Sequence, residues 1–210
     1  MSRNPDLVRV KICGLRRMED IEYVNACLPD YAGFVFAKSR RQVTEAKARK
    51  LREALDAQIQ TVGVFVNEEM ERICRLCSQG IIDFIQLHGD ENEDYVKKLS
   101  DCVQAPIIRA VRVRSREQIL AAQQGACDYL LLDTYMPGQY GGGGQAFDED
   151  FIPPLLKPWF LAGGLDAENV REKIDRHHPF GVDVSSKVET DGNKDLEKIR
   201  AFIENVRGLR

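Results

Sequence analysis

Two residues that can exchange protons each end a short apolar run of the sequence. Cys13 ends the run VRVKIC, and Asp133 ends the run DYLLLD. A carboxyl group can donate a proton and a thiolate can accept one, so the pair is suited to general acid–base catalysis. Lys11 lies on the same side of an extended strand as Cys13 and would favour the thiolate. Each residue also has a structural interpretation, because a cysteine there is more often a small core residue and an aspartate can cap a helix or turn.

Two pairs of small residues accompany the last two apolar runs. Gly163 and Gly164 end the first of these runs, and Ser185 and Ser186 end the second. Glycine lets backbone N–H groups approach phosphate oxygens, and seryl hydroxyls add further donors. Either pair alone would indicate a turn or a helix cap. Both together predict a phosphate site between the two loops.

Other polar residues follow the intervening runs. Arg40 and Arg41 come after AGFVF, and an arginine can bind a carboxylate or phosphate through two parallel hydrogen bonds; we expect at most one of the two to do so. His88 follows QL and either binds substrate or caps its loop. Asp183 lies in the last run. The glycine-rich stretch at 140–145 is typical of a loop that closes over a substrate.

The cysteines do not form a metal or redox motif. Cys74 and Cys77 are two residues apart, but they share one apolar stripe with Met70 and Ile73, and no second pair accompanies them. We therefore predict that both cysteines pack in the core, and we predict no metal site.

The apolar runs themselves indicate how these residues are positioned. Short, nearly continuous apolar runs are typical of parallel strands that helices cover on both faces. Amphipathic segments lie between them, among them 44–55 and a helix that we expect Asn67 to cap. Eight such runs occupy 8–13, 32–36, 61–66, 82–87, 106–111, 128–133, 159–163 and 181–185.

Eight strand–helix units favour one architecture over another. A doubly wound sheet usually has fewer strands and often a glycine-rich first turn, whereas the first turn here is ICGLRR. We predict an α/β fold, a (β/α)8 TIM barrel, formed by residues 1–210 as a single domain. In such a barrel the loops after the strands meet at one mouth, where we expect the polar residues above to converge.

Composition excludes several classes of protein. The chain of 210 residues is 43% hydrophobic and 30% charged, with a net charge of −3, so it has no basic excess for nucleic acid. No apolar run approaches the ~18 residues of a membrane span, and the first residues show no secretory signal. We expect a cytoplasmic protein without nucleic-acid or membrane partners. A monomer is favoured, because no long apolar stripe is evident, and a homodimer remains open.

The motifs, in this order, resemble those of phosphoribosylanthranilate isomerases, which act in tryptophan biosynthesis. The family usually has glycine where this chain has Lys187, and a proline near the position of Asp191. The matching pieces span nearly the whole chain: KICG (11–14), GFVF…SRR (33–41), VGVFVN (62–67), QLHGDE (86–91), LLLDT (130–134), the glycine-rich loop (141–148), LAGGL…NV (161–170) and VDVSSKVE…KD (182–195).

The resemblance implies a cofactor-free Amadori rearrangement of N-(5-phosphoribosyl)anthranilate. Asp133 would be the general acid that opens the furanose ring, and Cys13 the general base that removes the C2′ proton. Arg41 would hold the anthranilate carboxylate, and Asp183 the bridging amine. The phosphate would bind at the two small-residue pairs, Gly163 with Gly164 and Ser185 with Ser186.

Two other functions remain open from the sequence. The related isomerase of histidine biosynthesis carries out the same rearrangement on a bulkier substrate, but it uses an aspartate where this chain has Cys13. A sensor of phosphorylated ligands would retain the two small-residue pairs without needing both Cys13 and Asp133. Turnover of phosphoribosylanthranilate separates the isomerase from the sensor.

Overall fold

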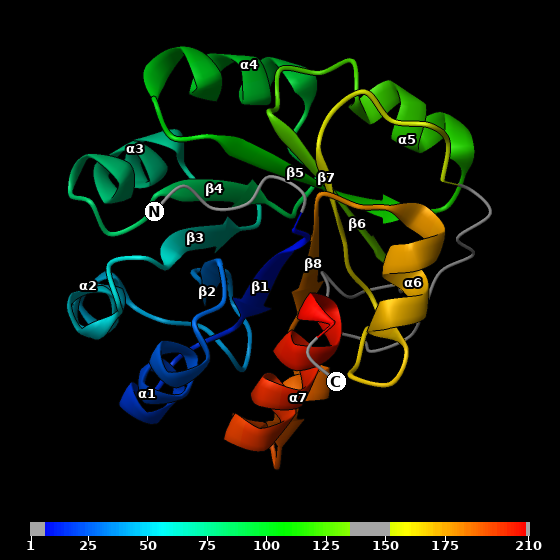
Figure 1. The fold of residues 1–210 in the computed structure, drawn as a ribbon. Helices are drawn as coiled ribbons and strands as arrows, with labels where there is room; N and C mark the ends of the chain where they lie inside the picture. The colour runs from blue at the N-terminus through cyan, green and yellow to red at the C-terminus, as the bar shows by residue number, and fades with distance from the viewer. Residues whose placement is uncertain (1–6, 135–151, 209–210) are drawn as a thin grey trace.

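Eight parallel strands form a closed barrel in the computed structural model, which describes residues 7–134 and 152–208. The strands pair in sequence order, and β8 returns to pair with β1 (Figure 1). The predicted (β/α)8 barrel is therefore confirmed. The strands are β1 (Arg9–Cys13), β2 (Tyr31–Val35), β3 (Gln60–Phe65), β4 (Phe84–Leu87), β5 (Ile107–Val113), β6 (Tyr129–Thr134), β7 (Trp159–Leu161) and β8 (Gly181–Val184).

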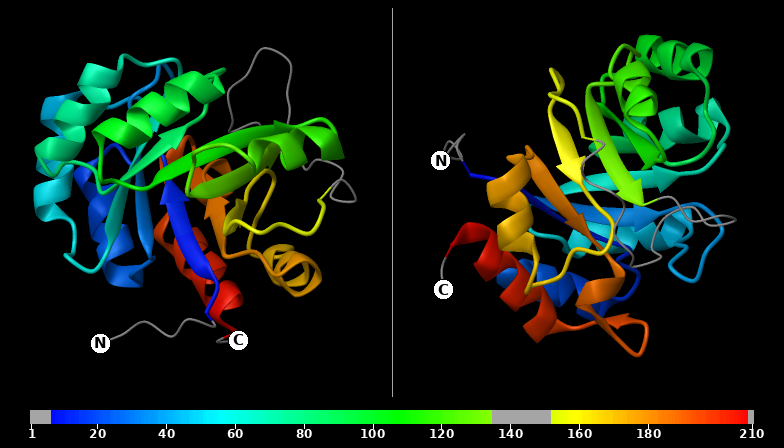
Figure 2. Two further views of the ribbon diagram at one scale, coloured as in Figure 1. Left: turned by 90° about the horizontal axis from the view of Figure 1, so that it is seen from above. Right: turned by 90° about the vertical axis from the view of Figure 1, so that its right-hand side faces the viewer.

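Helices surround the barrel on the outside, and α7 lies beside α1 where the ring of helices closes (Figures 1 and 2). Residues 152–158, which precede β7, form no helix, and the adjacent Pro153 and Pro154 disfavour one. None of the described helices is long and apolar enough to cross a membrane. The helices are α1 (Met18–Cys27), α2 (Glu45–Ala54), α3 (Met70–Ser78), α4 (Glu93–Cys102), α5 (Arg116–Ala122), α6 (Val170–His177) and α7 (Leu196–Arg207).

The third helix begins later than the sequence predicted. Its N-cap is Glu69, so the prediction that Asn67 caps it was wrong. Asn67 instead has a positive φ of 50°, which asparagine tolerates better than most residues. Its side-chain oxygen accepts a hydrogen bond from the backbone N–H of Asp90 at 2.9 Å. Asn67 therefore joins the loops after β3 and β4.

The interior of the barrel changes from aromatic to polar along the strands. At the level of Tyr31, aromatic rings close the barrel: Phe84 and Phe160 pack edge-on against Tyr31, with ring centroids 5.2 and 5.6 Å away. Side chains alternate along a strand, so the residue two positions further on also points inward. Two positions beyond Phe84 lies Gln86, at the polar end of the barrel. The site can open only there, at the carboxyl ends of the strands.

A short excursion follows β8 before the last helix. A 3₁₀ turn, η2 (Ser186–Val188), leads into the hairpin of β9 (Glu189–Thr190) and β10 (Asn193–Lys194). Its two-residue loop, Asp191 and Gly192, has positive φ at both positions (51° and 75°), as an Asp-Gly turn of type I′ requires. The hairpin returns Lys194 to the mouth of the barrel.

Candidate active site

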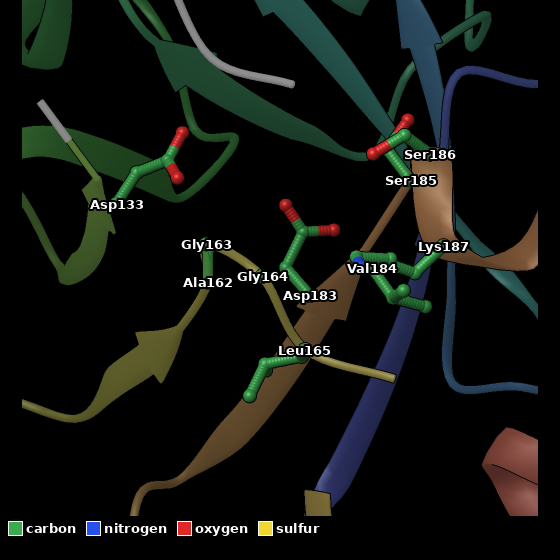
Figure 3. A pocket seen from close by; sticks show the side chains of 10 residues that line it. All are labelled: Asp133, Ala162, Gly163, Gly164, Leu165, Asp183, Val184, Ser185, Ser186 and Lys187. Atoms are coloured by element: carbon green, nitrogen blue, oxygen red, sulfur yellow. The ribbon is translucent and has the colours of Figure 1, made fainter. Parts of the chain in front are cut away.

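Two adjoining cavities occupy the mouth of the barrel. The larger, of about 360 Å³, extends over the ends of β1 to β4. The smaller, of about 50 Å³, lies between the loops after β7 and β8 (Figure 3). Asp133, Asp183 and Ser185 line both cavities, so the two form one continuous site.

Cys13 ends β1 and lines the larger cavity. Its partner across the β1–β2 ladder is Gly33, and a Cβ there would lie 2.7 Å from the thiol sulfur. Gly33 is thus needed to make room for the thiol. From the other side, the Ser185 hydroxyl donates to the Cys13 carbonyl oxygen at 3.0 Å. These contacts hold the end of β1 in place.

An ion pair lies beside the thiol. The ammonium of Lys11, fully buried, donates to Asp183 Oδ1 at 2.9 Å. Burial by itself would lower the pKa of Lys11, but Asp183 and Cys13 together raise it above its ordinary value. Burial raises the pKa of the Cys13 thiol, while Lys11 and, more weakly, Lys194 act in the opposite direction. A buried thiol therefore faces a permanent ammonium, as the sequence predicted for Lys11.

Arg41 is held at the cavity by a carboxylate that the sequence did not predict. Glu189 accepts from Arg41 Nε at 2.7 Å and from Arg41 Nη2 at 3.0 Å. It also accepts from the buried Lys194 at 2.9 Å. Burial would raise the pKa of Glu189, but the bonds from Arg41 and Lys194 lower it below its ordinary value. Arg40 touches the same carboxylate, but its side chain is 60% exposed and does not line the cavity.

Asp133 lies near the carboxyl end of β6, across the mouth of the barrel from Cys13. His88 lies beside Asp133. His88 Nε2 is 3.3 Å from Asp133 Oδ2, a close contact but not a well-aligned hydrogen bond. Gln86 Nε2 lies 2.8 Å from His88 Nδ1, and all three side chains are buried. An amide nitrogen can only donate, so this orientation makes Nδ1 an acceptor and leaves the proton on Nε2, facing Asp133. The sequence patterns did not single out Gln86, although it lies two residues before His88 and so on the same side of the chain.

The two small-residue pairs face each other across the smaller cavity (Figure 3). Gly163 and Gly164 have φ values of 83° and 70°, a backbone that other residues rarely adopt. Across from them, Ser185 and Ser186 begin the η2 turn. The two loops therefore lie together, as the sequence predicted, around a small space.

The remaining sequence predictions have separate outcomes. Cys74 and Cys77 pack partly buried against the core, and burial raises the pKa of Cys77 to about 11. No cluster of potential metal ligands occurs among the residues that the structure describes. The glycine-rich stretch at 140–145 lies outside the described residues.

Similarity to known proteins agrees with this geometry. A model of the family described as N-(5'phosphoribosyl)anthranilate (PRA) isomerase matches residues 10–205. The chain belongs to this isomerase family. It is 49% identical to N-(5'-phosphoribosyl)anthranilate isomerase of Lachnoclostridium phytofermentans, over 93% of this chain and 96% of that one.

Solved structures of this family have the same fold. The phosphoribosyl anthranilate isomerase of Thermus thermophilus superposes with a TM-score of 0.83 at 32% identity, over 97% of this chain and all of that one. A second isomerase structure, with a TM-score of 0.79 at 36% identity, covers 96% of this chain and all of that one. That isomerase is in complex with reduced 1-(o-carboxyphenylamino)-1-deoxyribulose 5-phosphate. The resemblance drawn from the motifs is confirmed at the level of the family.

Proposed function

We propose that the chain converts N-(5-phosphoribosyl)anthranilate into 1-(2-carboxyphenylamino)-1-deoxyribulose 5-phosphate, a step of tryptophan biosynthesis. One observation carries the proposal: the continuous site has phosphate-type donors at one end and a guanidinium at the other, with Cys13 and Asp133 between them. The substrate has the same order of groups, with a phosphate, a sugar and a carboxylated ring. The product-like ligand in the related isomerase has this order too.

The two ends of the site would bind the two ends of the substrate. The aromatic ring would lie against Val35, Val64 and Val66, which form an apolar wall of the larger cavity. Arg41 would meet the ring carboxylate, since a guanidinium binds a carboxylate through parallel hydrogen bonds. The phosphate would bind between the loops of Gly163–Gly164 and Ser185–Ser186. The sugar then spans Asp133, Asp183 and Cys13.

Asp133 would act first, as a general acid. It gives its proton to the furanose ring oxygen, the bond from that oxygen to C1′ breaks, and the amine nitrogen forms a protonated Schiff base with C1′. His88, with its Nε2 proton towards Asp133, would orient the carboxyl group and stabilise the carboxylate that remains.

Cys13 would act second, as a general base. Its thiolate takes the C2′ proton, and the electron pair of that bond forms the enamine. The enamine becomes the ketone when C1′ gains a proton and the C2′ hydroxyl loses one. The net reaction consumes no proton, so one proton must pass from Cys13 back to Asp133 between turnovers. Asp183, held by Lys11, would accept a hydrogen bond from the bridging amine.

A turnover assay tests this function. Phosphoribosylanthranilate made in situ is fluorescent, and we expect the purified protein to remove it and form the ketose product without an added cofactor or metal. Binding without turnover would identify a sensor of phosphorylated ligands instead. Turnover of the bulkier histidine-pathway substrate, but not of phosphoribosylanthranilate, would assign the related isomerase. The cytoplasmic location, the single domain and the preference for a monomer stay predictions, which fractionation, limited proteolysis and sedimentation can test.

A further inference from the structure

The smaller cavity has an unusual charge balance for a phosphate site. Among the described residues that line it, the charged ones are Asp133, Asp183 and Lys187. Asp183 is neutralised by Lys11. A phosphate monoester carries about −1.5 to −2 charges near neutral pH. Such an anion requires a compensating cation, and Lys187 is the one cation among the described residues that line this cavity.

Lys187 is placed to provide it. It lies in the η2 turn directly after Ser186, and its side chain runs from this turn towards the loop after β7 (Figure 3). Its ammonium is 4.0 Å from Asp166 Oδ2, at the limit of an ion pair, and its side chain is 44% exposed. A half-exposed pair at this distance contributes little, so the ammonium can leave Asp166 readily.

Hydrogen bonds fix Asp166 in its loop, whereas the exposed side chain of Lys187 is free to change its rotamer. Asp166 Oδ1 accepts from the backbone N–H groups of Glu168 and Asn169, each at 3.0 Å. These bonds hold the carboxylate in the loop that leads to α6. The lysine stem, in contrast, has four rotatable carbon–carbon bonds and a compact charge at its end.

We propose that Lys187 is a phosphate-binding residue of this chain, with its ammonium exchanging Asp166 for the substrate phosphate. The proposal rests on the proposed function, because it takes the phosphate of that substrate to lie in the smaller cavity. The other donors of this cavity are neutral backbone and hydroxyl groups. Lys187 therefore sets how strongly binding depends on the charge of the phosphate and on salt.

The test uses inorganic phosphate as the probe and four variants of the full chain. Phosphate binding is measured by calorimetry and as competitive inhibition of turnover. We expect Lys187→Gln to weaken phosphate binding about tenfold at low salt, with much of the difference lost near 1 M salt, because screening removes the contribution of one exposed charge. Lys187→Arg should restore binding to within about twofold, since it keeps the charge. The KM for substrate should rise in parallel in Lys187→Gln, with kcat changed much less.

Two further variants separate this effect from a change of net charge or of folding. Lys98→Gln removes an equal charge from the exposed face of α4 and should leave phosphate binding unchanged. Asp166→Asn keeps the Oδ1 acceptor but weakens the competitor of the phosphate, and should tighten phosphate binding about twofold. A tighter complex cannot result from a damaged fold.

The outcomes distinguish this proposal from the proposed function. If the wild-type protein turns over substrate but Lys187→Gln and Asp166→Asn bind phosphate as wild type does, the role of Lys187 is wrong and the isomerase function stands. If phosphate binding depends on Lys187 but substrate is not turned over, the role of Lys187 stands and the isomerase function is wrong.

Discussion

The two sides of the barrel mouth surround their reactive groups in different ways. On the β1–β8 side, Cys13 lies among charged groups: Lys11 with Asp183, and Lys194 with Glu189. On the β4–β6 side, Asp133 meets the imidazole of His88, which Gln86 orients. Both reactive groups are about equally buried, at 8% and 6% exposure. Cys13 and Asp133 therefore differ in the charge of their neighbours and not in their burial.

The difference matches what each proposed role requires. A base must become charged, as a thiolate, in a place where burial opposes charge, so it needs cations nearby. An acid must be aimed at the substrate oxygen and leaves a carboxylate behind, so it needs a neutral hydrogen-bond donor that orients the group and stabilises this carboxylate. We therefore expect loss of the cation beside Cys13 to change the pH dependence of the reaction, and loss of the residue that orients His88 beside Asp133 to change its rate.

The largest effects are expected from the two reactive groups themselves. Cys13→Ala and Asp133→Asn should each lower kcat by about 10²- to 10⁴-fold, the usual contribution of a general acid or base. KM should change little, because each group acts mainly in the transition state. Steady-state assays measure both constants, and Cys102→Ala, at an exposed cysteine of α4, is the matched control. Turnover at the wild-type rate in either variant would remove that residue from the mechanism.

The next largest effect is expected from Lys11→Met. The pKa of the Cys13 thiol is already raised by burial, so kcat/KM should increase with pH through the neutral range, by up to about tenfold per pH unit. Loss of the Lys11 ammonium raises that pKa further, because the cation favours the thiolate. The rising limb of the pH profile should therefore move to higher pH.

Lys11→Met should also destabilise the fold, since it leaves the half-buried Asp183 carboxylate without its partner. The expected cost is about 3–5 kcal/mol in urea unfolding. The double variant Lys11→Met/Asp183→Asn should recover part of this stability without returning the pH profile to its wild-type position. A profile that does not move in Lys11→Met would show that the charged side does not control the thiol.

A smaller effect is expected on the other side, from Gln86. Gln86→Leu removes the donor to His88 Nδ1 and should lower kcat about fivefold, the equivalent of one hydrogen bond of about 1 kcal/mol. Gln86→Glu favours the other tautomer of His88, because a carboxylate accepts a hydrogen bond from a proton on Nδ1 and leaves Nε2 without one. Its kcat should be lower than that of Gln86→Leu. Equal rates in both variants would mean that the His88 tautomer does not matter, and NMR of the imidazole nitrogens can observe it directly.

The smallest effect is expected at the carboxylate-binding end. Glu189→Gln keeps the shape of the side chain but weakens its hold on Arg41. KM should rise about threefold with kcat unchanged, because Arg41 would still bind the substrate carboxylate but with less fixed orientation. Arg40→Ala is the control, since Arg40 touches the same carboxylate from solvent. A fall in kcat without a change in KM would contradict this positioning role.

Local sequence patterns predicted the strands and the residues at their ends, because these depend on neighbours close in the chain. All eight apolar runs became barrel strands, and Cys13 and Asp133 lie at their carboxyl ends as expected. The same kind of rule failed at Asn67, because an N-cap is a preference of about 1 kcal/mol, and its bond to Asp90 in the next loop competes with it.

The sequence by itself determined the strands, their order and which residues reach the mouth of the barrel, since these follow from the alternation of side chains along each strand. Only the tertiary structure decided which charged residues pair with one another at this mouth. Lys11 and Asp183 are 172 residues apart in the chain, and Arg41 and Glu189 are 148 apart. No periodic pattern connects such positions. Closure of the barrel brings β8 beside β1 and carries the hairpin after β8 over the mouth, so the charges around the thiol exist only once the fold is complete.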